Sequence, residues 1–255
     1  MAELPALNPK KRPRTVAPQG LQGQVAVVTG ASRGIGQAIA AVLAAQGCAV
    51  VVTGRNQAAL KKAAAQLTRY RTPILAVVCD VRDPQAVVAL FAAVRRRFHR
   101  VDILVNNAGV AHADLPVGKL PPQAWKEVIE TNLTGTFLVT QAALPLMKRG
   151  SVIVNNLSIV AKKVFPGSSA YNASKHGALG FTNTLREELR EQGIRVIALL
   201  PGATDTEIWN TLWPEAPRKK MMSPKTVAQA VVNALSTADD GTVEELIILP
   251  TAGTL

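Results

Sequence analysis

VAVVTGASRGIG, residues 25–36, joins an apolar, β-branched run to an amphipathic segment through three glycines, Gly30, Gly34 and Gly36. Glycine permits a tight turn and lets backbone N–H groups approach a phosphate, and the N-terminus of a following helix adds the positive end of its dipole. Glycine triplets also occur in ordinary turns, but this one follows a strand pattern and opens a helix pattern, as a dinucleotide-binding loop requires. The stretch therefore predicts a strand–loop–helix unit that binds a nucleotide.

Outward from this stretch, short apolar runs alternate with longer amphipathic segments. The sequence predicts strands in the runs VAVVTG, AVVVTG, ILAVVCD, DILVNNAG, SVIVNNLS, RVIALLPG and VEELIIL. It predicts helices over residues 36–46, 57–69, 84–98, 122–147, 170–192 and 223–236. Apolar strands without alternation are typical of parallel strands buried on both faces. We therefore expect the α/β class, with a Rossmann-type doubly wound sheet of seven mainly parallel strands flanked by helices.

The N-terminal residues 1–20 differ in composition from the rest of the chain. They are proline-rich and contain the basic run KKRPR, residues 10–14, within a chain of formal net charge +12. We expect a solvated, disordered tail, followed by a single domain over residues 21–255. The alternative is a nucleic-acid-binding arm, whose affinity for DNA would be salt-sensitive and would disappear on deletion of the tail. The remaining charge indicates a general bias toward anionic ligands such as phosphates.

The sequence favours a reducing, cytoplasmic location without a membrane span. The N-terminus lacks the apolar segment of a signal peptide, and the longest apolar run, residues 38–52, is interrupted by Gln46 and Gly47. The two cysteines, Cys48 and Cys79, each border a hydrophobic run. That placement indicates buried free thiols and not a disulfide framework.

The end of the second predicted strand indicates which dinucleotide is bound. Folds that bind NAD usually place an acid there, on the ribose 2′-hydroxyl. This chain has Gly54 and Arg55 at that point, and Arg33 lies in the glycine loop. Two guanidiniums suit a 2′-phosphate, so we expect NADP(H) as the cofactor. Asp80, at the end of the third strand, is placed to accept a hydrogen bond from the adenine amino group.

A second group of polar residues follows the later strands. The motif NNAG, residues 106–109, ends the fourth strand, and Ser158 ends the fifth. Asn132 lies within the long predicted helix, while Tyr171 and Lys175 are one helical turn apart in YNASK. In a doubly wound sheet the carboxyl ends of the strands meet at one crevice, so we expect these residues to converge there.

These motifs together resemble the short-chain dehydrogenase/reductase family, in its compact single-domain branch. The matching elements are TGASRGIG, NNAG, Asn132, Ser158, YNASK and PGATDT, in the order and spacing of the family, over roughly residues 20–250. The resemblance implies an NADPH-dependent reductase that converts an aldehyde, ketone or 3-oxo acid or ester to an alcohol, and that runs in reverse as an alcohol dehydrogenase. It implies a single NADP-binding oxidoreductase domain over residues 21–255, small-molecule substrates, and a homotetramer or dimer.

The resemblance also implies roles for the catalytic residues. Tyr171 resembles the general acid that protonates the carbonyl oxygen, and Ser158 resembles the residue that polarises the carbonyl. Lys175 resembles the lysine that holds the nicotinamide ribose, and Asn132 resembles the residue that anchors a proton-relay water. A cation about 4 Å from a phenol at an effective dielectric of about 20 favours phenolate by roughly 4 kcal/mol. We therefore expect Lys175 to lower the pKa of Tyr171 from about 10 by roughly three units.

The expected cofactor site draws residues from six segments, and no metal site is expected. Its members are Gly30, Ser32, Arg33, Gly34, Ile35, Gly36, Arg55, Asp80, Val81, Asn107, Ala108, Gly109, Tyr171, Lys175, Pro201, Gly202, Thr204 and Thr206.

Several features leave the substrate open. Acyl-carrier-protein reductases often have an arginine where this chain has Gln192, but Lys148 and Arg149 could still meet an acidic carrier, so 3-oxoacyl-[acyl-carrier-protein] reductase remains an alternative. A non-enzymatic NADPH-binding regulator ranks lower, because the serine, tyrosine and lysine are all present. The stretch from Thr206 to Met222 predicts a lid. Its tryptophans and methionines fit either a substrate pocket or packing of the lid onto the domain.

Overall fold

The seven strands of the described residues form one parallel sheet. The computed structural model describes residues 20–237 and 241–253, so the predicted tail lies outside the described residues except for Gly20. The strand order is β3-β2-β1-β4-β5-β6-β7, and every neighbouring pair is parallel. The order reverses between β1 and β4, which is the switch point of a doubly wound sheet. The predicted fold class is confirmed.

The strands and helices lie close to their predicted positions. The strands are Val25–Val28 (β1), Ala49–Gly54 (β2), Ile74–Val78 (β3), Ile103–Asn106 (β4), Val152–Asn156 (β5), Arg195–Pro201 (β6) and Glu245–Ile248 (β7). The helices are Gly34–Ala45 (α1), Gln57–Leu67 (α2), Pro84–Phe98 (α3), Pro122–Ile129 (α4), Gly135–Ala143 (α5), Ser169–Arg190 (α6), Trp209–Leu212 (α7) and Pro224–Leu235 (α8). Within the described part of the chain, no helix is long and apolar enough to cross a membrane.

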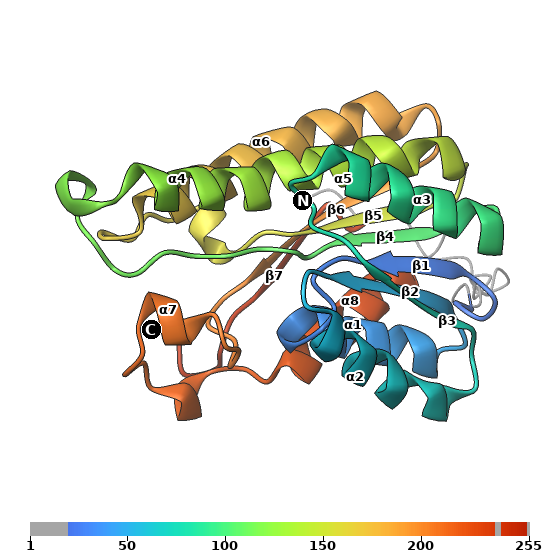
Figure 1. Cartoon of the computed structure of the whole chain (residues 1–255), viewed down its shortest axis with the longest axis horizontal. Helices are drawn as coiled ribbons and strands as arrows, with labels where there is room; N and C mark the ends of the chain where they lie inside the picture. Colours follow the sequence, from blue (N-terminus) through green and yellow to red (C-terminus); the bar gives the residue numbers. More distant parts are fainter. Residues whose placement is uncertain (1–19, 238–240, 254–255) are drawn as a thin grey trace, which may run out of the picture.

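Both faces of the sheet are covered by helices. Successive strand residues point to opposite faces. Ala26 and Val28 of β1 lie in a core cluster with residues of α1, α2 and α8, whereas Val27 lies in a second cluster with residues of α3, α5 and α6. Figure 1 shows α1, α2 and α8 on one side of the sheet and α3 to α6 on the other. Burial on both sides explains why the strand sequences are apolar without alternation.

The two edge strands depart from that pattern. β3 and β7 end the strand order, so each has a neighbour on one side only. Val78 of β3 is 48% exposed and Ile247 of β7 is 47% exposed. The prediction that all seven strands are buried on both faces is therefore wrong at the edges, where helical cover is incomplete.

The predicted helix over residues 122–147 contains a change of helical register. A π-turn over Glu130–Thr134 separates α4 from α5, and the N–H of Gly135 donates to the carbonyl of Glu130, five residues earlier. A π-turn adds a residue to one turn, which redirects the side chains that follow. Asn132 lies within this turn and is buried.

The lid, residues 206–222, is anchored at its two ends. The N–H of Met222 donates to the carbonyl of Ala203 at 3.0 Å, and the N–H of Asp205 donates to the carbonyl of Met222 at 2.9 Å. Within the lid, the guanidinium of Arg218 donates to the carbonyl of Thr206 at 2.7 Å and to Oδ1 of Asn210 at 2.7 Å. Figure 1 shows the lid and α7 beyond the ends of the strands, away from the helical layers.

The glycine loop tolerates no side chain at Gly36. A Cβ there would lie 2.3 Å from Nδ2 of Asn107 and 2.6 Å from the carbonyl of Gly30. We expect Gly36→Ala to lower the free energy of unfolding by about 1–3 kcal/mol, as overpacking does. Gly180 in α6 is the control, because a Cβ at that position would meet nothing within 4 Å. Gly180→Ala should stabilise by about 0.5–1 kcal/mol. Urea unfolding of both variants checks this, and equal stabilities would contradict it.

Candidate active site

One large cavity opens at the carboxyl ends of the strands. Its volume is about 720 Å³, and it is bounded by the glycine loop, the strand ends, α6 and the lid. Gly36 and Asn132 do not line it. The other predicted site residues do: Gly30, Ser32, Arg33, Gly34, Ile35, Arg55, Asp80, Val81, Asn107, Ala108, Gly109, Ser158, Tyr171, Lys175, Pro201, Gly202, Thr204 and Thr206.

The glycine loop presents backbone and not side chains to this cavity. Gly30 has φ +61°, and a Cβ there would lie 2.8 Å from Cα of Ala108. At the start of α1, the N-cap residue Arg33 makes no side-chain cap, and no acid lies in the first turn. An uncapped helix N-terminus beside closely packed backbone is suited to a phosphate group. The loop therefore fits the pyrophosphate of a dinucleotide.

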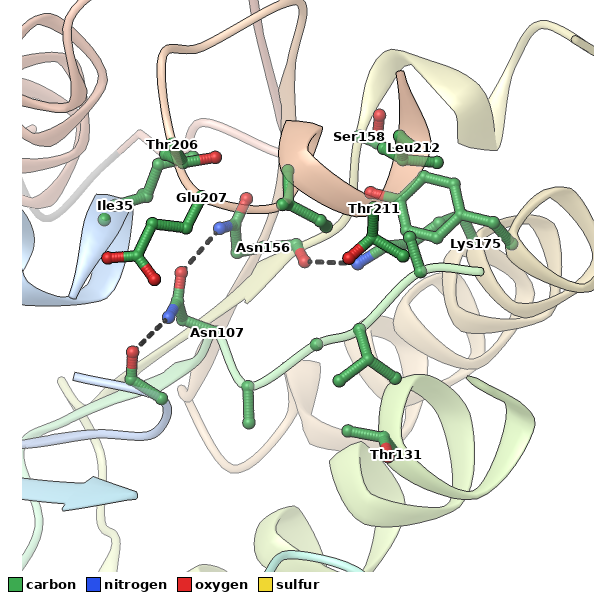
Figure 2. A pocket seen from close by; sticks show the side chains of 18 of the residues that line it. Ile35, Asn107, Thr131, Asn156, Ser158, Lys175, Thr206, Glu207, Thr211 and Leu212 are labelled. Carbon is green, nitrogen blue, oxygen red and sulfur yellow. Dashed lines mark hydrogen bonds between the residues drawn. The ribbon is translucent and has the colours of Figure 1, made fainter. Parts of the chain in front are cut away.

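A chain of hydrogen bonds joins the glycine loop to Lys175 (Figure 2). Nδ2 of Asn107 donates to the carbonyls of Thr29 at 2.9 Å and Gly30 at 3.1 Å. Oδ1 of Asn107 accepts from Nδ2 of Asn156 at 2.7 Å. Nζ of Lys175 donates to the carbonyl of Asn156 at 3.1 Å. The ends of β1, β4 and β5 and the lysine of α6 are thus held in a fixed relation.

Ser158, Tyr171 and Lys175 meet at the other end of the cavity. The first turns of α6 place Tyr171 and Lys175 on one face of the helix, with Nζ 5.5 Å from the centre of the tyrosine ring. Ser158 follows β5, and its Oγ accepts from the N–H of Val160 at 3.2 Å. A phenol, a hydroxyl and an ammonium group therefore face the same space, which is the set needed to polarise and protonate a carbonyl oxygen.

Burial shifts the pKa of both titratable groups toward the neutral form. It raises the pKa of Tyr171 to about 12, against a smaller opposite effect of the hydrogen bond with Ser158. It lowers the pKa of Lys175 to about 8. The predicted lowering of the tyrosine pKa by the lysine is therefore wrong for the protein without cofactor. Desolvation is the main cause of both shifts, whereas the prediction considered only the attraction between the two groups.

Asn132 is positioned as a clamp behind the cavity. Its Oδ1 accepts from the N–H of Val110 at 2.8 Å, and its Nδ2 donates to the carbonyl of Val110 at 2.9 Å and to Oγ of Ser174 at 3.0 Å. It thereby ties the π-turn, the segment after β4 and α6 together. These contacts occupy its amide, and its expected role with a relay water stays a prediction.

The two arginines predicted to bind a 2′-phosphate each have a carboxylate partner. Arg33 forms an ion pair with Glu207 of the lid. Nη1 of Arg55 lies 3.5 Å from Oε1 of Glu127 in α4. All four side chains line the cavity.

Asp80, predicted to bind the adenine, is held by its neighbour Arg82. Nε of Arg82 donates to Oδ1 of Asp80 at 3.0 Å, and Nη2 donates to Oδ2 at 2.6 Å. These hydrogen bonds hold the pKa of Asp80 below its usual value. The carboxylate is therefore ionised and fixed in orientation, and its contact with adenine stays a prediction.

The cavity includes residues that sequence reasoning did not select. The hydroxyl of Thr131 is buried without a hydrogen-bond partner and lines the cavity, so it offers a donor to a ligand. It directly precedes Asn132 in ETNLTG, which was the available signal. Other lining residues that were missed include Glu127, Asn156, Phe165, Glu207, Thr211 and Leu212.

The lid tryptophans and methionines have different surroundings. Trp209 and Trp213 line the cavity, and Nε1 of Trp209 donates to the carbonyl of Thr204 at 2.9 Å. Met221 and Met222 do not line it, and Met222 packs into the hydrophobic core. The pocket interpretation therefore applies to the tryptophans, and the packing interpretation applies to Met222.

Comparison with known proteins agrees with this geometry. The family model described as short chain dehydrogenase matches residues 24–217. Farnesol dehydrogenase of Aedes aegypti is 39% identical over 236 residues, which cover 89% of this chain and 96% of that protein.

Solved structures show the same fold. An alcohol dehydrogenase from the archaeon Thermococcus sibiricus, complexed with 5-hydroxy-NADP, superposes with a TM-score of 0.85 at 31% identity, covering 92% of this chain and 99% of that one. The 3-ketoacyl-(acyl-carrier-protein) reductase of Brucella melitensis, complexed with NADH, has a TM-score of 0.83 at 30% identity, covering 91% and 99%. With its parallel sheet, its glycine loop and these matches over most of its length, the chain belongs to the short-chain dehydrogenase/reductase family of oxidoreductases, which act on CH–OH groups.

Proposed function

We propose that the chain is an NADPH-dependent reductase of an aldehyde, a ketone or a 3-oxo acid or ester, reversible as an alcohol dehydrogenase. The observation that carries this proposal is the single cavity in which Ser158, Tyr171 and Lys175 lie at one end and Arg33 and Arg55 at the other. The complex of the Thermococcus sibiricus relative with 5-hydroxy-NADP supports the choice of cofactor.

In the proposed reaction the protein donates the proton and stabilises the charge that results. NADPH, when bound, supplies the hydride that the carbonyl carbon accepts. Tyr171, with a pKa of about 12, keeps its proton at neutral pH and can donate it to the carbonyl oxygen. The hydroxyl of Ser158 donates a hydrogen bond to the same oxygen, which polarises the carbonyl. Lys175 is largely protonated at pH 7, and its charge stabilises the phenolate that Tyr171 becomes.

Apolar side chains in the cavity wall indicate that part of the substrate is apolar. Leu157, Phe165, Trp209 and Trp213 line the cavity near the lid and the catalytic residues. Such a wall binds hydrocarbon or aromatic groups through burial of apolar surface. The similarity to a farnesol dehydrogenase supports a substrate of this kind.

A 3-oxoacyl-[acyl-carrier-protein] substrate is the second candidate. The Brucella melitensis relative carries that name. In this chain, however, Nη2 of Arg149 donates to the carbonyl of Glu191 at 2.9 Å, so this arginine already has a role at the end of α6. A small carbonyl compound that is not attached to a carrier protein therefore remains the preferred candidate substrate.

We further propose a homo-oligomer, tetramer or dimer, in a reducing, cytoplasmic compartment, with one domain over residues 21–255. Trp125 of α4 and Phe137 of α5 are exposed apolar side chains, as is Ile247 on the edge strand β7, and such surfaces suit burial against another copy. Cys48 and Cys79 are both buried and free.

Loss of both arginines should reduce the preference for NADPH. Arg33→Ala with Arg55→Ala removes two guanidiniums whose charge-assisted bonds to a phosphate contribute roughly 1.5–3 kcal/mol each. The ratio of kcat/KM with NADPH to that with NADH should fall by at least about tenfold. Arg97→Ala is the control, because Arg97 lies over the ring of Phe98 in α3, outside the cavity. Equal efficiency of the unmodified protein with both cofactors would contradict the proposal.

Tyr171→Phe should abolish carbonyl reduction while leaving NADPH binding intact. The phenyl ring keeps the shape but has no proton to donate. Ser158→Ala should lose part of the rate, on the order of 10²-fold or more, through weaker polarisation. NADPH oxidation with a panel of aldehydes, ketones and 3-oxo esters, together with a fluorescence titration of NADPH, measures both effects. Turnover of the phenylalanine variant at the parent rate would show that another group is the acid.

Lys175→Met should lose reduction and yet stabilise the fold at pH 7, because folding buries the charge of Lys175. The lysine pKa is about 8 in the folded protein and about 10.4 in an unfolded chain. Below pH 8 both states are protonated, and between pH 8 and 10.4 only the unfolded state keeps the proton, so the parent gains stability as pH rises. The stability advantage of the variant over the parent should shrink by up to about 3 kcal/mol across this window. Urea unfolding at pH 7 and pH 10 tests this, and a pH-independent difference would refute it.

A further inference from the structure

We propose that Glu207 and Glu127 determine how strongly the cofactor site prefers NADPH, because an adenosine 2′-phosphate has to displace them from Arg33 and Arg55. This inference rests on the proposed use of NADPH. It assigns a role to the two carboxylates that form ion pairs with Arg33 and Arg55, the predicted phosphate-binding residues.

The Arg33–Glu207 pair joins the glycine loop to the lid. The side chain of Arg33 is 67% exposed and that of Glu207 is 58% exposed, and both line the cavity. Figure 2 shows Glu207 reaching from the lid toward the start of α1 at Ile35. Exposed ion pairs are weak, whereas a phosphate accepts several charge-assisted bonds from a guanidinium. A phosphate at this point is therefore able to replace the carboxylate.

The second arginine at the cavity, Arg55, is likewise paired with an exposed carboxylate, that of Glu127. Glu127 lies 3.5 Å from Nη1 of Arg55 and 3.8 Å from Nη1 of Arg82. If Arg55 turns to a phosphate, Glu127 keeps a cationic neighbour. The exchange thus leaves Glu127 with a counter-charge.

Glu207 also has other basic side chains nearby. A second hollow adjoins the cavity, and Glu207 lines both. Arg69, Arg218 and Lys225 line this second hollow. Once released from Arg33, the carboxylate can therefore turn toward this second hollow and its basic side chains.

The two carboxylates act selectively on the phosphorylated cofactor. NADH has no 2′-phosphate, so its binding leaves both ion pairs in place. NADPH has to compete with both carboxylates and also experiences their repulsion. Glu207 and Glu127 therefore reduce a preference that the arginines alone would make larger.

The opposing interpretation is that the Arg33–Glu207 pair is only a strap that holds the lid against the glycine loop. Loss of a strap would loosen the lid over the whole cofactor. It would therefore weaken or strengthen the binding of NADPH and NADH alike. The two interpretations differ in whether the effect depends on the 2′-phosphate.

Glu207→Gln, Glu127→Gln and the double variant, with NADPH and NADH titrated separately by nucleotide fluorescence without substrate, test the inference. The dissociation constant of NADPH should fall by about two- to five-fold for each substitution, the range of a weak exposed ion pair. That of NADH should stay unchanged. The gain should shrink at high salt, because the competing charges are exposed.

Glu187→Gln is the matched control. Glu187 pairs with Arg190 at 2.7 Å on α6 and lines neither hollow, so the substitution removes the same charge and the same kind of pair. It should change neither dissociation constant. Suppose that the parent prefers NADPH. This inference alone is then overturned if Glu207→Gln changes the dissociation constants of both cofactors equally, or if the variant binds NADPH no more tightly than the parent does. A parent that binds NADH as tightly as NADPH would overturn the proposed cofactor preference and the inference together.

Discussion

The amide of Asn107 is the contact on which the geometry of the cavity depends. It lies against Gly36, where a Cβ would approach Nδ2 to 2.3 Å, and it donates to the carbonyls of Thr29 and Gly30. On its other side it accepts from Asn156, whose carbonyl accepts from Lys175. The glycine at residue 36 is thus required for a hydrogen-bonded chain that ends at the lysine, and the glycine loop and Lys175 are positioned relative to each other by direct contacts.

This arrangement places polar groups where burial is costly. The ammonium group of Lys175 is buried with its pKa lowered to about 8, and the hydroxyl of Thr131 is buried without a partner. A buried polar group without a full set of hydrogen bonds destabilises the folded state. Both residues line the cavity, where a ligand can complete their interactions.

Local signals in the sequence predicted much of the fold and many of the cavity residues. The glycine loop, the apolar strands and the spacing of Tyr171 and Lys175 each act over a few residues, and the structure brings them to one cavity. Properties that depend on the three-dimensional surroundings of a residue could not be predicted from the sequence. The direction of the tyrosine pKa shift depends on burial, and the Arg33–Glu207 pair joins residues 174 positions apart. The π-turn at Asn132 likewise depends on packing against α6 and the segment at Val110, which no local pattern encodes.

Charge acts on two length scales in this protein. The chain has 29 lysines and arginines against 17 acids, and such an excess attracts anions of every kind at long range. At the cavity, however, Arg33 and Arg55 are already matched by Glu207 and Glu127. A weak or singly charged anion gains little by displacing a carboxylate of equal charge. In the proposed cofactor site, a ligand that also places a pyrophosphate on the glycine loop gains at several points at once, so it can displace the carboxylates even though they reduce the gain from its further phosphate.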